Sequence, residues 1–181
     1  MELIETPLKD CYIVRNQIFG DDRGFFLESY NSTKLAELGI EFEVKQINFA
    51  KSQKNVLRGL HFQKAPFEQA KLVGVISGAV TDVVVDIRKD SPTYFGTFKM
   101  KLDSPDTLLY IPKGFAHGYH TLADDTLFYY AVDQFYAPDH ESGIRYNDET
   151  LNIDWGGIEN AVISPKDLNQ PLLKELEIDK S

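Results

Sequence analysis

VGVISGAVTDVVVDI, residues 73–87, carries the strongest strand signal in this chain. Two runs rich in valine and isoleucine, 73–77 and 79–87, lie on either side of a Ser-Gly pair. Valine and isoleucine favour extended backbone, and Ser-Gly is typical of a tight turn. The stretch therefore predicts a β-hairpin. Alternate residues from Val83 to Ile87 are expected on one face of the second strand, with the residues between them on the other.

Further segments show the same type of pattern. Residues 97–102 alternate apolar and polar side chains, while 107–111 and 126–136 are rich in β-branched and aromatic residues. Proline- and glycine-containing turns separate them. Short strands divided by such turns predict an all-β sandwich or barrel.

Helix signals are few and short. Asn31-Ser32-Thr33 predicts a capped helix that runs through Leu38 and stops at Gly39. Ser164-Pro165 predicts a second helix start, with a capping serine and proline at the first helical position. We therefore expect a few short peripheral helices around a β core.

Length and composition predict one globular domain, residues 1–181, with 43% hydrophobic residues. A net charge of −9 without a basic stripe excludes a nucleic-acid-binding surface. The N-terminus has no signal-peptide pattern, and no apolar run is long enough to span a membrane. The single cysteine, Cys11, excludes an internal disulfide. We expect a cytoplasmic protein without membrane contact, frayed from about Lys174 onward.

The heptapeptide LRGLHFQ, residues 57–63, contains the first candidate for chemistry. Arg58 and Gly59 interrupt an apolar strand pattern, and such interruptions often have functional reasons. Strand alternation places residues 57, 59, 61 and 63 on one face, where Gly59 leaves room beside His61 for a close approach. A core histidine beside a surface arginine is the alternative interpretation.

A metal site is not expected. A metal site needs several ligands that converge on one point. His61 is followed by Phe62 and Gln63, so the H-x-H pair of metal-binding barrels is absent. His117 and His120 are three residues apart, which does not aim both at one ion. Serine-elbow, Walker and Rossmann motifs are also absent.

Acid–base chemistry remains, with His61 as the candidate base because imidazole titrates near neutrality. A base of this kind needs an orienting carboxylate, for which Asp86 and Asp167 are the candidates, although capping of a helix also explains Asp167. Lys71 begins a predicted strand and could place an ammonium at a site. Tyr129 and Tyr130 point in opposite directions, so one of them is expected to face inward.

Several motifs, in this order, resemble those of the dTDP-4-dehydrorhamnose 3,5-epimerase family, from about residue 8 to about residue 172. The matching stretches are FGDDRGFFLES (19–29), VLRGLHFQ (56–63), KLV (71–73), VVDIRKDSPT (84–93), IPKGFAHG (111–118), YAP (136–138), IDW (153–155) and SPKD (164–167).

The resemblance implies a cupin-like jelly roll without metal or cofactor, and a homodimer in which an N-terminal strand can add to the partner's sheet. It also implies epimerisation at C3 and C5 of a nucleotide-linked 4-keto-6-deoxy sugar. The expected reaction converts dTDP-4-dehydro-6-deoxy-D-glucose to dTDP-4-dehydro-L-rhamnose, in the biosynthesis of rhamnose for cell-surface polysaccharides.

The resemblance also implies residue roles. His61 matches the general base, Asp167 its orienting carboxylate, Lys71 the cation near the C4 oxygen, and Tyr130 the acid on the opposite face. The residues that match substrate contacts are Arg23, Glu28, Gln46, Asn48, Arg58, His117, Glu141 and Lys166, with Phe135 and Tyr136 as aromatics at the nucleotide end.

Some positions depart from the family pattern, namely Ala70, Tyr110, Leu127, Ala131 and Phe135. These departures leave open the identity of the sugar and nucleotide, and whether both carbons are inverted. A mono-epimerase acting at C3 or C5 alone is the near alternative. A metal-dependent jelly-roll enzyme and a non-catalytic sugar-binding module are more distant ones, and the combination of base, cation and phenol argues against the latter.

Overall fold

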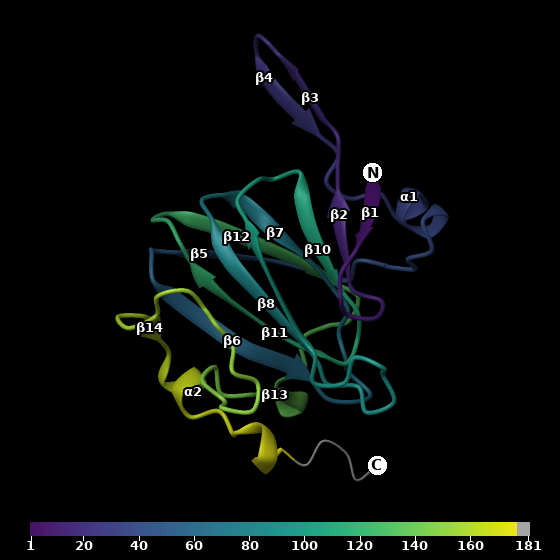
Figure 1. Cartoon of the computed structure of the whole chain (residues 1–181). Helices are drawn as coiled ribbons and strands as arrows, with labels where there is room; N and C mark the ends of the chain where they lie inside the picture. The colour runs from purple at the N-terminus through teal and green to yellow at the C-terminus, as the bar shows by residue number, and fades with distance from the viewer. Residues whose placement is uncertain (177–181) are drawn as a thin grey trace.

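The computed structural model describes residues 1–176, and most of its regular structure is antiparallel β-sheet (Figure 1). The all-β class is therefore confirmed, while the prediction that the chain is one domain stays a prediction. The first sheet has the order β1 (Glu2–Glu5), β2 (Tyr12–Arg15), β10 (Thr107–Ile111), β7 (Lys71–Ser77), β12 (Thr126–Val132), β5 (Gln46–Ser52).

The second sheet has the order β13 (Glu141–Gly143), β6 (Val56–Gln63), β11 (Phe115–Thr121), β8 (Val80–Asp86), β9 (Thr97–Leu102). The short strand β14 (Val162–Ile163) pairs with β6 in parallel. A separate hairpin, β3 (Ile18–Asp21) and β4 (Gly24–Leu27), projects away from both sheets (Figure 1).

The hairpin predicted for residues 73–87 is wrong, although both of its strands exist. β7 pairs with β10 and β12 in the first sheet, whereas β8 pairs with β11 and β9 in the second. The turn at Gly78, which has a φ of +83°, thus carries the chain from one sheet to the other. Both strands are flanked by neighbours on both sides, a pairing that local periodicity cannot reveal.

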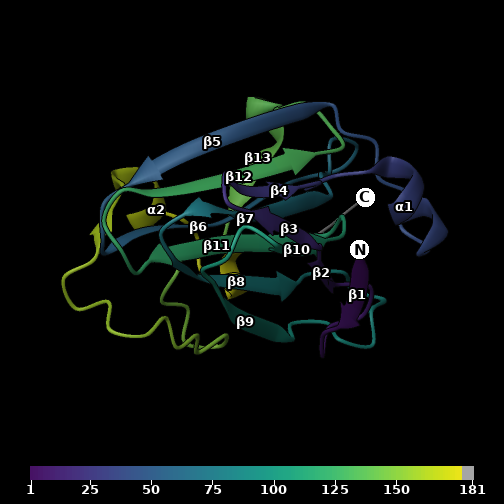
Figure 2. The ribbon, with the colours of Figure 1, turned by 90° about the horizontal axis from the view of Figure 1, so that it is seen from above.

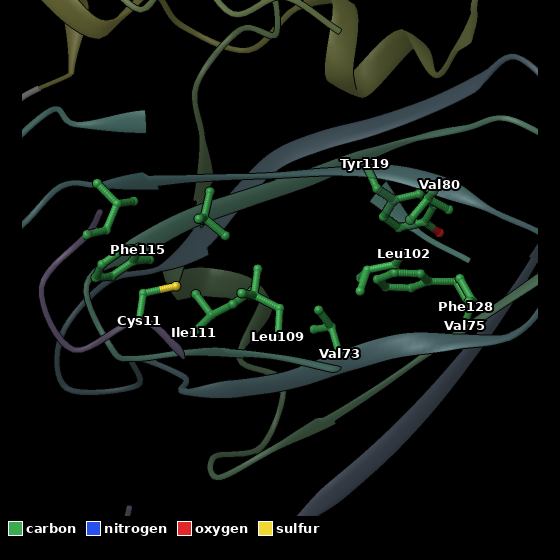
Figure 3. Close-up of a cluster of buried hydrophobic side chains, with 12 residues drawn as sticks. Cys11, Val73, Val75, Val80, Leu102, Leu109, Ile111, Phe115, Tyr119 and Phe128 are labelled. Atoms are coloured by element: carbon green, nitrogen blue, oxygen red, sulfur yellow. The ribbon is translucent and has the colours of Figure 1, made fainter. Parts of the chain in front are cut away.

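The main core lies between the two sheets, as Figure 3 shows. Val73 and Phe128 come from the first sheet and meet Val80, Leu102 and other side chains of the second. Both sheets are also covered on their outer faces. The C-terminal segment packs Trp155 on the second sheet, and helix α1 (Ser32–Glu37) packs Leu35 on the first.

Coverage on both faces explains why β8 is buried along nearly its whole length. Val83 and Val85 pack under the C-terminal segment, and Val84 lies between the sheets, which confirms the predicted alternation. Asp82 and Asp86 are fully buried, so their carboxylates need partners inside the protein.

The predicted helices are confirmed, and they lie on opposite sides of the molecule (Figure 2). Asn31 caps α1, which is followed by Gly39 with a φ of +88°. Ser164 caps α2 (Pro165–Leu168) by accepting the N–H of Asp167. Two 3₁₀ turns complete the short helices, η1 (Pro138–His140) and η2 (Leu173–Glu175).

Two predicted segments end differently in the structure. The strand expected over 126–136 ends at Val132, and residues 133–136 have no regular structure. Residues 173–175 form η2 with Leu173 buried, so the chain is ordered past Lys174. The rest of the tail expected to fray, 177–181, lies outside the described residues. In the part of the chain that is described, no helix is long and apolar enough to cross a membrane.

A bulge where β6 pairs with β11 changes the faces predicted for the heptapeptide 57–63. His61 pairs with His117 and Arg58 with Tyr119, so two residues of β6 oppose the single residue Gly118. Arg58 and His61 therefore both face the space between the sheets, and the predicted alternation through Leu57 is wrong.

The room beside Gly59 is filled by another strand. A Cβ atom at Gly59 would lie 2.5 Å from the Cα of Gly118, and Gly59 has a φ of +123°. Glycine at this position therefore allows two backbones to meet.

Gly59→Ala should destabilise the protein by about 3 kcal/mol, because it adds a backbone clash to an unfavourable φ. Gly24→Ala is a matched control, since Gly24 has a φ of +127° with nothing within 4 Å of the added Cβ. The control should cost only about 1 kcal/mol. Chemical denaturation measures both, and equal losses would contradict the close packing of β6 on β11.

Candidate active site

A cavity of about 640 Å³ opens between the two sheets. Side chains from both sheets and from α2 line it, so the residues that meet there are far apart in the sequence. The lining includes nine of the predicted site residues: Arg58, His61, Lys71, His117, Tyr130, Tyr136, Glu141, Lys166 and Asp167.

His61 and Asp167 form a hydrogen-bonded pair in the wall of this cavity. His61 lies on β6 and Asp167 on α2, and Nε2 of the ring is 2.7 Å from Oδ1 of the carboxylate. The second oxygen, Oδ2, accepts the backbone N–H of Gly59 at 3.1 Å. The predicted pairing of His61 with Asp167 is present, and capping explains only the backbone of Asp167.

The two side chains of this pair differ in their exposure to solvent. The side chain of Asp167 is 4% exposed and that of His61 is 30% exposed. Burial acts to raise the pKa of Asp167, but the hydrogen bond and charge of His61, with hydrogen bonds from Gly59 and Ser164, outweigh it, so this pKa lies below its usual range. An ionised, buried carboxylate therefore fixes the orientation of a ring that remains accessible from the cavity.

Asp86, the other candidate for this carboxylate, is engaged elsewhere. It accepts hydrogen bonds from Arg88, Ser91 and Thr93. Arg88 also contacts Asp10, so the cluster anchors the loop after β8 to the N-terminal segment. Asp86 has a structural role and does not line the cavity.

A second histidine–aspartate pair lies beside the first. His117 on β11 is the cross-strand partner of His61, and its Nε2 is 2.9 Å from Oδ2 of Asp82. Asp82 is completely buried, and its other oxygen has no hydrogen-bond partner among the described residues. Asp82 is a site residue that was not predicted from the sequence, although an aspartate within a valine-rich strand is a signal that could have indicated it.

Lys71 is a buried ammonium in the cavity wall. It begins β7 and is only 8% exposed, and burial lowers its pKa from 10.5 to about 8. The negative charges of Asp82 and Glu141 partly oppose this shift. Lys71 is thus a cation that water does not screen, which strengthens its field on any oxygen placed in the cavity.

Tyr130 faces the cavity from β12, while its neighbour Tyr129 points to the other face of the sheet and contacts Ser29. The prediction that one of the two tyrosines faces inward is therefore confirmed. Burial raises the pKa of Tyr130, although the charge of Arg58 opposes the shift. The phenol accordingly keeps its proton at neutral pH and can donate it.

The rim of the cavity is formed by Tyr136, Glu141 and Lys166. Nζ of Lys166 lies 2.6 Å from Oε2 of Glu141, and the Tyr136 hydroxyl donates to the same oxygen. Burial acts to raise the pKa of Glu141, but the bonds from Lys166 and Tyr136 hold it below its usual range. Arg58 also lines the cavity and donates to the hydroxyl of Ser52 at 3.2 Å.

Three further predicted contacts lie next to the cavity but not in its lining. Gln46 and Asn48 are hydrogen-bonded to each other on β5, and Asn48 is the cross-strand partner of Tyr130. Gln46 also accepts the backbone N–H of Tyr136 at 3.1 Å. Phe135 is 60% exposed and precedes Tyr136 at the rim.

Arg23 and Glu28 are not brought to the cavity of their own chain. Arg23 lies at the tip of the projecting β3–β4 hairpin, paired with Asp21, and its side chain is 90% exposed. Glu28 follows β4 and binds Nζ of Lys34 at 2.6 Å. Phe19, Phe25 and Phe26 on the same hairpin are all more than half exposed.

The arrangement fits proton transfer at carbon. The His61–Asp167 pair lies on the second sheet and its attached helix, whereas Tyr130 and Lys71 lie on the first sheet. A ligand between the sheets would therefore meet a base on one side and a proton donor on the other. Over residues 1–176, no group of three or more His, Cys, Asp and Glu side chains could hold a metal ion.

Comparison with known proteins agrees with this chemistry. Residues 5–175 match the family model described as dTDP-4-dehydrorhamnose 3,5-epimerase. The enzyme of that name from Escherichia coli K12 is 45% identical over 179 residues, which cover 97% of this chain and 96% of the relative.

Solved structures of such enzymes superpose closely. That from Bacillus anthracis, with TDP and PPi bound, has a TM-score of 0.92 and 44% identity, covering 95% of this chain and 99% of the other. That from Legionella pneumophila, in complex with dTDP-4-keto-L-rhamnose, has a TM-score of 0.92 and 42% identity, covering 98% and 94%. These matches confirm the predicted cupin-like jelly roll.

Lys71→Met should stabilise the protein below pH 8, by a few kcal/mol, because it removes a buried charge. Between pH 8 and 10.5 Lys71 is neutral in the folded protein, while the same side chain is still protonated in the unfolded chain. The free energy of unfolding of the wild-type protein therefore rises with pH in this window, whereas that of the variant lacks this contribution. The advantage of the variant should shrink across this window.

Denaturant unfolding of both proteins from pH 6 to pH 10 measures this difference. Lys51→Met is the control, because the Lys51 side chain is 64% exposed and its replacement should change stability by less than about 0.5 kcal/mol. A Lys71→Met difference that stays constant with pH would show that Lys71 is not a desolvated cation.

Proposed function

The chain belongs to the dTDP-4-dehydrorhamnose 3,5-epimerase family and is an isomerase, and we propose that its cavity carries out the family's proton transfers with His61, Lys71 and Tyr130. The proposed substrate is dTDP-4-dehydro-6-deoxy-D-glucose, and the product is dTDP-4-dehydro-L-rhamnose. The observation that carries the proposal is the placement of base and acid on opposite sheets around one cavity.

His61 is the proposed base. Its hydrogen bond to the ionised Asp167 fixes the ring and stabilises the imidazolium that forms when a proton is taken up. The proton comes from C3 or C5, each next to the C4 ketone, and its electron pair moves toward the C4 oxygen to give an enolate. Asp167 stays ionised throughout and acts on the substrate only through His61.

Lys71 stabilises the charge on the C4 oxygen. A proton next to a ketone becomes removable when the resulting oxyanion is stabilised, and a pre-placed cation in a water-poor cavity does this effectively. Lys71 is buried and has its pKa lowered to about 8, so it is largely protonated at neutral pH. His117, held by Asp82, supplies a further polar group from the second sheet.

Tyr130 is the proposed acid. It gives its proton to the enolate carbon from the face opposite His61, which inverts that carbon. The phenolate and imidazolium left behind return to their starting states by exchanging protons with water. The raised pKa of Tyr130 keeps the phenol protonated until the enolate forms.

The diphosphate and nucleotide bind at the rim in this proposal. Arg58 and Lys166 supply positive charge at the cavity, and guanidinium groups bind phosphate oxygens in pairs. Tyr136, 52% exposed at the rim, supplies an aromatic face for the base. These local cations allow a protein of net charge −9 to bind an anionic substrate.

We further propose that the enzyme is a homodimer in which the β3–β4 hairpin of one protomer reaches the cavity of its partner. Arg23 and Glu28 match substrate contacts of the family yet lie outside the cavity of their own chain. The hairpin also exposes three phenylalanines, as expected for a surface buried in an interface. A cytoplasmic location is likewise our proposal, and the buried, free Cys11 is compatible with it.

His61→Ala and Tyr130→Phe should each lower kcat about a thousandfold while the protein stays folded, because each removes one of the two proton-transfer groups. Turnover is followed by NMR of the sugar product. Tyr129→Phe is the matched control, since Tyr129 lies on the same strand but faces away from the cavity, and its kcat should stay within about twofold. Near wild-type turnover in both His61→Ala and Tyr130→Phe would contradict the assignment.

Mixing two inactive variants tests the homodimer. Arg23→Ala and His61→Ala protomers are expected to be weak or inactive alone. In a mixed dimer, the protomer with an intact His61 receives Arg23 from its partner, so mixing after mild dissociation should restore activity. If Arg23 serves its own chain, no mixed dimer has a complete site, and activity should stay at the level of the single variants.

A further inference from the structure

Gln63, the last residue of β6, is a buried polar side chain that the proton transfers do not use. It is 6% exposed, and its amide bonds to three backbone groups. Nε2 donates to the carbonyl oxygens of Phe67 at 2.6 Å and Phe135 at 3.2 Å, and Oε1 accepts the N–H of Ala137 at 2.7 Å. Both amide hydrogens and the oxygen are thus engaged.

The bonds to Phe135 and Ala137 hold the backbone on either side of Tyr136. The N–H of Tyr136 itself donates to Gln46, and its hydroxyl donates to Glu141. The segment 133–137 has no regular structure, and its earlier part is held separately by Asp133 and Gln134, which bond to Ala70 and Gln69. The half-exposed ring of Tyr136 is therefore attached to a backbone that is hydrogen-bonded at Phe135, Tyr136 and Ala137.

The third bond of Gln63 ties this segment to a neighbouring turn. Phe67 closes a turn with Lys64, whose N–H donates to the carbonyl of His140 at 2.8 Å. The rings of Phe67 and His140 are in contact, with centroids 4.4 Å apart. Gln63, two residues beyond His61 in the same strand, therefore joins the rim segment before η1 to the turn that ends at Phe67.

We propose that Gln63 is a positioning residue for the nucleotide end of the site, which holds the Tyr136 segment ready to stack on the base of the substrate. This inference rests on the proposed function, because it requires a nucleotide at the rim. A segment that is ordered before binding loses less conformational entropy when the ligand arrives. Gln63 then contributes to affinity for the nucleotide and leaves proton transfer at the sugar unaffected.

The Gln63→Leu variant removes all three bonds and keeps a side chain of similar size. We expect it to weaken dTDP binding, measured by calorimetry, about tenfold, and to raise KM for the nucleotide sugar by a similar factor. The kcat at saturating substrate should stay within about twofold. Hydrogen exchange of the amides in residues 133–140 should become faster in the ligand-free variant.

Two further variants complete the test. Gln53→Leu is the matched control, because among residues 1–176 the Gln53 amide reaches only the exposed Asp125, at 3.4 Å, and its dTDP affinity should equal that of the wild type. Gln63→Glu keeps the size of the side chain but loses both donors when ionised. Burial against two carbonyls raises the pKa of this carboxyl, so dTDP affinity should recover as pH falls and the group donates again.

The outcomes separate this inference from the proposed function. Gln63→Leu with unchanged dTDP affinity and unchanged exchange of residues 133–140, or with a lowered kcat alone, would overturn the positioning role. If Gln63→Leu does not fold, the pH dependence of Gln63→Glu decides, and an affinity that does not vary with pH overturns it. Wild-type protein that neither binds dTDP nor epimerises the sugar would refute the proposed function itself.

Discussion

The close approach of β6 to β11 at Gly59 and Gly118 is the constraint on which the site depends. A side chain at either glycine would meet backbone atoms of the other strand. The bulge at this point places Arg58 and His61 on the same side of β6, facing the cavity. It also leaves the N–H of Gly59 directed at Asp167, so one carboxylate binds the strand backbone and the histidine together. Packing of two strands thereby sets the geometry of the proposed base.

The division of the chain into two sheets has an equally direct consequence. The turn at Gly78 sends β7 and β8 to different sheets, and the cavity opens between these sheets. Inversion at carbon requires a base on one face of the sugar and an acid on the other. A fold of two layers places these two groups on opposite sides of the cavity, because His61 lies on β6 of the second sheet and Tyr130 on β12 of the first. The same packing buries Lys71, so the cation proposed to act on the C4 oxygen is shielded from water.

Much of this could be predicted from sequence where the signal is local. Several strand positions, both helix caps and the opposite orientations of Tyr129 and Tyr130 follow from alternation and capping rules that involve only neighbouring residues. The placement of β7 and β8 in different sheets could not be predicted, because a turn of this kind serves equally well within one sheet or between two. The face of Arg58 depends on a bulge created by Gly118, about sixty residues away. Asp82 resembles Asp86 in sequence, and only tertiary contacts distinguish the partner of a cavity histidine from a loop anchor.

The central claim is that His61 removes protons from carbons next to the ketone and Tyr130 returns them from the opposite side. The most direct measurement is incubation with dTDP-4-dehydro-6-deoxy-D-glucose in deuterated water, followed by NMR at C3 and C5. Wild-type protein should introduce deuterium at both carbons with inversion. Tyr130→Phe should exchange without net inversion, and His61→Ala should not exchange. Deuterium at one carbon only would indicate a mono-epimerase, and inversion without any deuterium uptake would contradict the proton-transfer account.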